Sequence, residues 1–258
     1  MIRKIISWFV KKHLKVTSPN NLFIANTVKC KKDSRDYEDT LVTTSIPDEY
    51  VIPNLPSIRN QKTIGSCASH AAVRVAETYL KQKGRYLEGS EMFHYYVARK
   101  EIAKTYPKLT GMTIKDACKT LQKYGMGLEK LSPYKVSSAN EKPNQLAYVL
   151  AAFYKVRYYY RLHNLEQIKN SILNDTPVIF GLMIDDNFMS LNKWKKIWTP
   201  GGRSRGGHAL TIVGYNNITN RFLVDNSWGY NWGKLGQFEI SYDDFKKKSF
   251  DWFKIEMR

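Results

Sequence analysis

Three residues whose side chains can cooperate in nucleophilic catalysis lie far apart in this chain of 258 residues: Cys67, His208 and Asn226. Cys67 follows a glycine-containing turn and begins a segment with helical periodicity, and the positive end of a helix dipole lowers a thiol pKa. His208 begins a predicted strand and can accept the thiol proton. Asn226 follows another predicted strand, and its amide can fix the imidazole tautomer. Each residue alone is commonly structural, but together they predict thiolate attack on a carbonyl carbon.

The elements that must position these residues change in character along the chain. Apolar residues at i, i+3 and i+4 predict a long helix over 68–80 that ends near Gly84, and a second helix over 113–124. Cys118 falls on the apolar face of the second helix, which predicts a buried thiol. A third helix is expected over 165–173, with Asn164 as its N-cap.

The second half of the chain is rich in predicted strands. Each is a short run of β-branched or aromatic residues bounded by Gly, Asn or Asp. Helices first and strands later predict an α+β protein with two lobes. The expected strands lie at about 177–183, 208–215, 222–224, 237–240 and 252–255.

Two motifs resemble those of the papain-like cysteine protease family. The run Asn226-Ser-Trp-Gly-Tyr-Asn-Trp-Gly233 is similar to the family motif Asn-Ser-Trp-Gly-x-x-Trp-Gly, and Gln61 stands six positions before Cys67, as the family's oxyanion-hole glutamine does. The order Cys, His, Asn with wide separation is also typical of that family. The run Ile46–Tyr50 is similar to the start of a mature domain, so the resemblance covers about residues 46–258.

The resemblance implies a helical lobe and a β-barrel-like lobe, with the active-site cleft between them. It implies that Cys67 is the nucleophile, that His208 is its general base and later its general acid, and that Asn226 orients His208. The amide of Gln61, with the backbone N–H of Cys67, would stabilise the oxyanion. Trp228 would shield the His–Asn hydrogen bond from water.

Other expectations concern the substrate and the departures from the family pattern. Gly206 and Gly207 leave room for a polypeptide substrate, and no cofactor or metal is expected because no metal-ligand spacing is present. Gly207 stands where many relatives carry Asp or Asn. Ile64 replaces a cysteine that is normally disulfide-bonded, and Ala68 replaces the aromatic residue after the nucleophile.

The first 45 residues read as a basic extension to a peptidase domain over 46–258, which divides into a helical part at about 46–145 and a β-rich part at about 146–258. Residues 2–10 have a short basic amphipathic pattern. A membrane-surface or partner-binding helix, a prosegment, and a helix packed on the main domain all fit this pattern. Residues 16–45 read as a linker or tail.

The net charge indicates which partners the protein attracts, and the number of cysteines indicates the redox compartment in which it is found. With 41 Lys and Arg against 23 Asp and Glu, the net charge of +18 favours polyanions such as nucleic acid or an acidic membrane surface. Three cysteines do not make a disulfide framework, so a reducing intracellular compartment is expected. No apolar run is long enough to span a bilayer, and no signal peptide is evident.

Three alternative functions remain open. The first is a different acyl-group chemistry at a Cys–His site, as in an amidase or a transglutaminase-like enzyme. Such enzymes lack the Asn-Ser-Trp-Gly motif at this position, whereas this chain has it. A papain-like scaffold that binds an anionic partner without catalysis would usually lose Cys, His or Gln, and this chain keeps all three. A nucleic-acid-binding protein is suggested by charge alone, without a recognisable binding motif.

Overall fold

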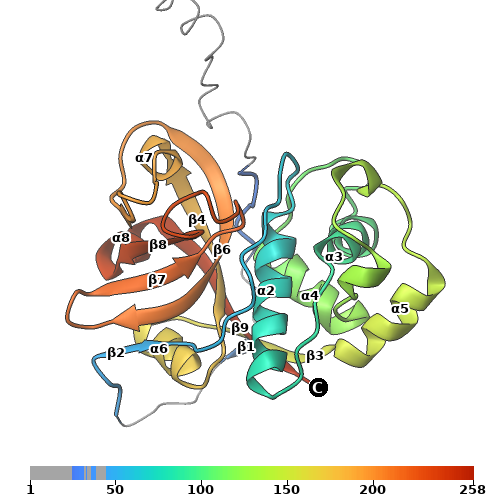
Figure 1. Cartoon of the computed structure of the whole chain (residues 1–258), viewed down its shortest axis with the longest axis horizontal. Coiled ribbons are helices and arrows are strands. Elements are labelled where there is room, and N and C mark those ends of the chain that lie inside the picture. Colours follow the sequence, from blue (N-terminus) through green and yellow to red (C-terminus); the bar gives the residue numbers. More distant parts are fainter. Residues whose placement is uncertain (1–24, 32, 34–35, 39–44) are drawn as a thin grey trace, which may run out of the picture.

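The computed structural model describes residues 25–31, 33, 36–38 and 45–258, and shows two lobes side by side (Figure 1). One lobe is built of helices, and the other contains most of the strands together with α6, α7 and α8. This arrangement confirms the predicted α+β, two-lobe fold. The helical segments are α2 (Cys67–Gln82), α3 (Glu91–Val97), η2 (Ala98–Ile102), α4 (Ile114–Tyr124), η3 (Glu129–Leu131), η4 (Val136–Ser138), α5 (Gln145–Ala151), η5 (Ala152–Tyr154), α6 (Leu165–Leu173), α7 (Asp186–Met189) and α8 (Tyr242–Lys248).

The three helices predicted from periodicity are confirmed, with ends that have local causes. In α4 the Thr113 side chain accepts a hydrogen bond from the amide of Asp116, and Gly125 ends the helix at a φ of 86°. In α6 the side chains of Asn164 and Gln167 form a reciprocal capping box. α2 is buried on nearly all sides because it lies between the other helices and the sheet.

The strands form one sheet in the order β1-β3-β9-β4-β6-β7-β8-β5, and β2 also pairs with β6. β6 is therefore the strand around which the site is built, with β4 and β7 beside it. The strands are β1 (Tyr37–Glu38), β2 (Glu49–Val51), β3 (Val156–Arg161), β4 (Val178–Asp185), β5 (Ile197–Trp198), β6 (Ser204–Asn216), β7 (Arg221–Asp225), β8 (Gln237–Ser241) and β9 (Ser249–Met257).

Several features of the sheet differ from the sequence-based prediction, which also lacked β2 and β5. His208 lies inside β6 rather than at its start, because the backbone of the preceding polar and glycine residues already pairs with β4. β3 was not predicted, and it pairs with β9 and with β1. The residues of β1 were expected to belong to a linker, but Tyr37 is in register with Tyr160 of β3.

The amphipathic pattern of residues 2–10 lies outside the described residues. No helix in the described part of the chain is long and apolar enough to cross a membrane.

Candidate active site

Cys67 is the first residue of α2, and its side chain is fully buried. The hydroxyl of Thr27 lies 2.9 Å from its sulfur. Backbone hydrogen bonds from Ala209, Ala68 and Asn26 also reach the thiol. Burial raises the pKa of Cys67, and these hydrogen bonds oppose the shift without cancelling it. The thiol is therefore favoured over the thiolate while the site is covered.

His208 and Asn226 come from the neighbouring strands β6 and β7, and their side chains form a direct hydrogen bond. The Nε2–H of His208 donates to Oδ1 of Asn226 over 2.7 Å, which leaves Nδ1 as the lone-pair nitrogen. Among the described residues, Nδ1 has no hydrogen-bond partner. Ala209, next to His208, contacts the thiol of Cys67, so strand and helix bring the imidazole and the sulfur into one site.

An aromatic cluster covers the His208–Asn226 pair. The ring of Trp228 lies over the imidazole, with 4.7 Å between ring centroids, and Phe188 lies 6.0 Å from His208 and 5.4 Å from Trp228. Burial lowers the pKa of His208 to about 4, although the hydrogen bond to Asn226 acts in the opposite direction. Above that pH the imidazole is neutral and able to accept a proton.

Gln61 lies between the loop before Cys67 and the residue after Asn226. Its Nε2 donates to the carbonyl of Ile64 over 3.1 Å, and its Oε1 accepts from the hydroxyl of Ser227 over 2.7 Å. Its backbone N–H also donates to the carbonyl of Ser227. The side-chain amide is thus held at a fixed orientation beside the start of α2.

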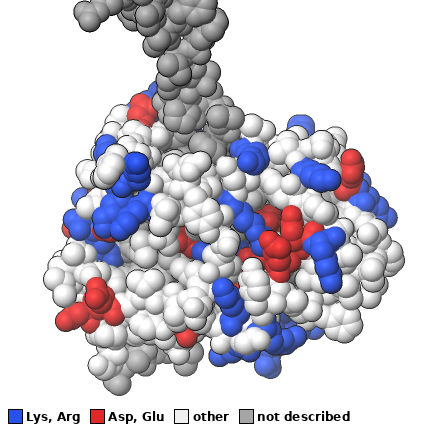
Figure 2. All heavy atoms as spheres, in the orientation of Figure 1, with Lys and Arg blue, Asp and Glu red and all other residues white. Residues whose placement is uncertain are grey.

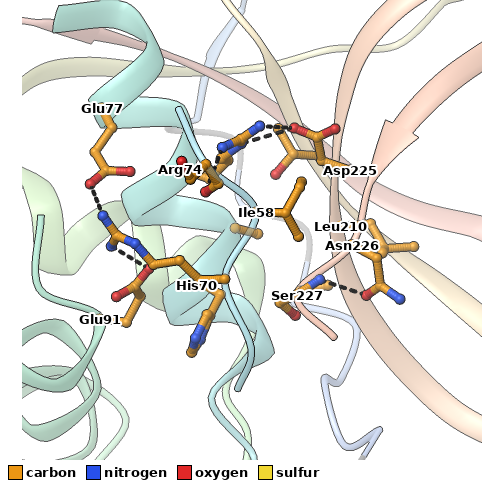
Figure 3. A pocket seen from close by; sticks show the side chains of 14 residues that line it. Ile58, His70, Arg74, Glu77, Glu91, Leu210, Asp225, Asn226 and Ser227 are labelled. Atoms are coloured by element: carbon orange, nitrogen blue, oxygen red, sulfur yellow. Dashed lines mark hydrogen bonds and ion pairs between the residues drawn. The ribbon is translucent and has the colours of Figure 1, made fainter. Parts of the chain in front are cut away.

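Buried charges behind the site fix these segments in place (Figure 3). Arg59, two residues before Gln61, forms ion pairs with Glu77 of α2 and Glu91 of α3. Two N–H groups of Arg74 of α2, on Nε and Nη2, donate to Oδ2 of Asp225, the residue before Asn226. These contacts tie the glutamine and the asparagine to the helices of the opposite lobe.

The two glycines before His208 face a segment from the N-terminal region. The amide of Thr27 donates to the carbonyl of Gly207 over 2.7 Å. A Cβ atom at Gly207 would lie 2.0 Å from the Thr27 carbonyl oxygen, and one at Gly206 would lie 2.7 Å from that of Ala25. Residues 25–27 lie beside these two glycines, where the sequence predicted room for a substrate chain. We call residues 25–31, 33 and 36–38 the N-terminal strap.

Charged contacts hold the strap on both lobes. Lys115 of α4 pairs with Asp33 at 2.9 Å and also with Asp36. Arg161 of β3 pairs with Asp36 and with Asp251 of β9, each at 3.1 Å. Asp36 therefore joins a cation of the helical lobe to a cation of the sheet.

The structure brings together the residues singled out in the sequence: Cys67, His208, Asn226, Gln61, Trp228, Gly206 and Gly207. Sequence reasoning missed Thr27, Asn26 and Ser227. The only sequence signal for Thr27 and Asn26 was the glycine pair before His208. Two glycines indicate that another segment of chain comes close, but they do not identify that segment. The expectation of a buried Cys118 is confirmed. In the described part of the chain, no cluster of three or more His, Cys, Asp or Glu residues has a geometry that could hold a metal.

Comparisons with known proteins identify the family and the fold. The model of the papain family of cysteine proteases matches residues 52–251. An uncharacterized peptidase C1-like protein of Acanthamoeba polyphaga mimivirus is 32% identical over 206 residues, which is 74% of this chain and 66% of that protein. Ananain of Ananas comosus is 26% identical over 191 residues, 72% of this chain and 52% of ananain, so the chain spans about half to two thirds of these relatives.

A solved structure gives the same fold. Xylellain, a cysteine protease from Xylella fastidiosa, superimposes with a TM-score of 0.83 at 24% identity, covering 90% of this chain and 95% of xylellain. The family match over most of the chain shows that this protein belongs to the papain family of cysteine proteases.

Proposed function

We propose that the protein is a cysteine endopeptidase that hydrolyses peptide bonds in polypeptides. The observation that carries the proposal is the 2.7 Å hydrogen bond from Nε2 of His208 to Asn226, which leaves Nδ1 as a proton acceptor. The next residue along the strand, Ala209, contacts the thiol of Cys67 through its backbone. A base in a defined tautomer next to a sulfur at a helix N-terminus is the arrangement that nucleophilic catalysis requires.

In the proposed reaction, Nδ1 of His208 takes the proton of the Cys67 thiol, and the sulfur attacks the scissile carbonyl carbon. Gln61 and the backbone N–H of Cys67 stabilise the negative oxygen of the tetrahedral intermediate. When the intermediate collapses, the carbon–nitrogen bond breaks and His208 gives its proton to the leaving amine. Water then hydrolyses the thioester, with His208 as base, and releases a carboxylic acid and the thiol.

The strap makes the described conformation a covered state. Thr27 lies on the nucleophile, and burial disfavours both the thiolate and the imidazolium. Displacing the strap would admit water and substrate and would make the charged pair less costly. We therefore propose that residues 1–45 act as an inhibitory extension of a peptidase domain at 46–258.

Complete burial of Cys67 and His208 also favours a second candidate, a papain-like scaffold without catalytic activity. The two candidates differ in what happens when the strap is shortened. Deleting residues 1–31 removes Thr27 and keeps Asp33 and Asp36. Deleting residues 1–24 keeps the whole strap and serves as the matched control.

The test is turnover of a peptide library by the two truncated proteins under reducing conditions. We expect turnover by the protein that lacks residues 1–31, at a kcat/KM at least about tenfold above that of the control. No turnover by either protein, together with unchanged melting, would favour the scaffold.

A further inference from the structure

The short helix α5, with the turn η5 that follows it, presents large apolar side chains to solvent and small ones to the core. The exposed fractions of Leu146, Val149 and Phe153 are 52%, 48% and 70%. Ala147 and Ala151 are fully buried on the opposite side. Large apolar residues are normally the buried ones, because burial stabilises in proportion to apolar area. Three large apolar side chains of this segment thus remain exposed, whereas Tyr148 of the same helix packs on Phe93 in the core.

The exposed residues have helical spacing, with Leu146 and Val149 in α5 and Phe153 in the 3-10 turn η5. Leu146, Val149 and Phe153 are three and four positions apart, and such residues lie above one another on a helical surface. We call these three residues the α5 stripe. α5 lies at the outer edge of the helical lobe, away from β6 (Figure 1). A partner on the α5 stripe would therefore lie away from the strand that carries His208.

Basic residues lie before and after α5 in the sequence, and one acidic residue, Glu101 of η2, interacts electrostatically with Tyr148 of α5. Lys155 follows η5 directly, and the carbonyl of Arg157 accepts a hydrogen bond from α4. Lys123 stands near the end of α4, where Gly125 packs against the carbonyl of Ala151. Lys142 precedes α5, and Glu141 is the one acidic residue between positions 140 and 158. At the edge of the molecule that carries α5, Figure 2 shows mostly uncharged surface, with both basic and acidic side chains beside it.

We propose that the α5 stripe docks on an anionic membrane surface, with its apolar side chains in the headgroup region and the neighbouring cations against acidic lipids. A bilayer interface offers both an apolar phase and negative charge, and interfacial helices use both. Nucleic acid would match the cations but gives no reason for an exposed aliphatic and phenyl stripe.

Charge also argues against two other occupants. In a two-fold dimer through this face, each cation would meet its own copy or a neighbouring cation. Residues 1–24 contain five Lys and Arg and no Asp or Glu, so that segment would be repelled by the same basic residues. An anionic lipid surface is the occupant that complements both the apolar stripe and the basic residues near it.

The test is co-sedimentation of the full chain, inactivated by Cys67→Ala, with two kinds of vesicle. One is phosphatidylcholine alone, and the other contains about one third phosphatidylserine. We expect binding to the acidic vesicles only. Replacing Leu146, Val149 and Phe153 with Ser should weaken that binding at least about tenfold. The double variant Lys123→Gln, Arg157→Gln should weaken it and reduce its dependence on salt.

A matched control replaces Ile218 and Leu235, apolar residues of the other lobe that are 73% and 66% exposed, with Ser. This control should bind as the parent does. Phe153→Ser alone provides a milder variant in case the triple variant melts early, and melting of every variant is measured by circular dichroism. In the active chain without residues 1–31, these replacements should leave turnover of a soluble peptide unchanged.

Several outcomes would overturn the proposal. They are no binding to acidic vesicles, undiminished binding by the well-folded Phe153→Ser and triple variants, or a parent dimer that the triple variant dissociates in analytical ultracentrifugation. Equal loss of RNA binding by the triple variant would assign the surface to nucleic acid instead.

Discussion

The Thr27 hydroxyl lies 2.9 Å from the Cys67 sulfur, although the two residues are 40 positions apart. The same threonine donates its backbone N–H to Gly207, the residue before His208. A single residue of the strap thus contacts both sides of the candidate active site. Reagents and substrates can reach the sulfur only when this contact opens.

The thiol of Cys67 should react with an epoxide inhibitor at a rate set by the strap. We expect slow labelling of the chain without residues 1–24 and much faster labelling without residues 1–31, measured by mass spectrometry of the modified peptide. Cys118 is an internal control, because burial raises its pKa above the ordinary range and keeps it unreactive. Preferred modification of Cys118 would contradict the assignment of Cys67.

Replacing the candidate catalytic residues should produce a graded loss of kcat in the chain without residues 1–31. Cys67→Ala and His208→Ala should abolish turnover, and the double variant should be no worse, because the two act as one unit. Asn226→Ala should retain more activity, because this substitution removes only the hydrogen bond that orients the imidazole of His208. Gln61→Ala should lower kcat by about 10²- to 10³-fold. An active His208→Ala enzyme would require a different base.

Asp36 should contribute to stability through its two cations. Asp36→Asn leaves Lys115 and Arg161, both largely buried, with one fewer anion each, and should lower the free energy of unfolding by about 3 kcal/mol. Deleting residues 1–45 also removes Asp33, so this deletion should lower the melting temperature more than deleting residues 1–31. Equal melting of the two truncated proteins would show that the ion pairs do not stabilise the domain.

The buried histidines should make stability depend on pH. Burial lowers the pKa of His94 from 6.5 to about 4. The folded protein therefore binds a proton at His94 only at a lower pH than the unfolded chain does. The stability that neutral His94 contributes is complete above pH 6.5 and is lost as the pH falls toward 4. The amount is on the order of 3 kcal/mol.

The expected measurement is the melting temperature between about pH 7 and about pH 4. His94→Gln should lose less melting temperature across this range than the parent. Glu77 has the opposite effect on the pH dependence, because burial raises its pKa to about 7. The stability that protonated Glu77 contributes is lost as the pH rises. Comparing parent and variant cancels this effect. His163→Gln, at an exposed position, is the control and should follow the parent.

The sequence predicted the parts of the fold that have local signals. The two capping residues of α6, Asn164 and Gln167, lie three positions apart in the sequence, and α4 ends at Gly125. The site could be predicted because the motif around Asn226 and the spacing of Gln61 from Cys67 are recognisable in one dimension. The strap could not, because Thr27 has no periodic pattern around it. Its role depends on contacts with residues 40 or more positions away.

The strap belongs to the same chain as the site that it covers, so its occupancy does not change on dilution. A tethered segment acts at an effective concentration on the order of millimolar. A diffusing peptide would have to exceed that concentration or bind more tightly, whereas a single cut between the strap and the domain would make the segment an ordinary dissociable ligand. One broken bond would then convert a block that persists on dilution into one that is lost as the protein is diluted.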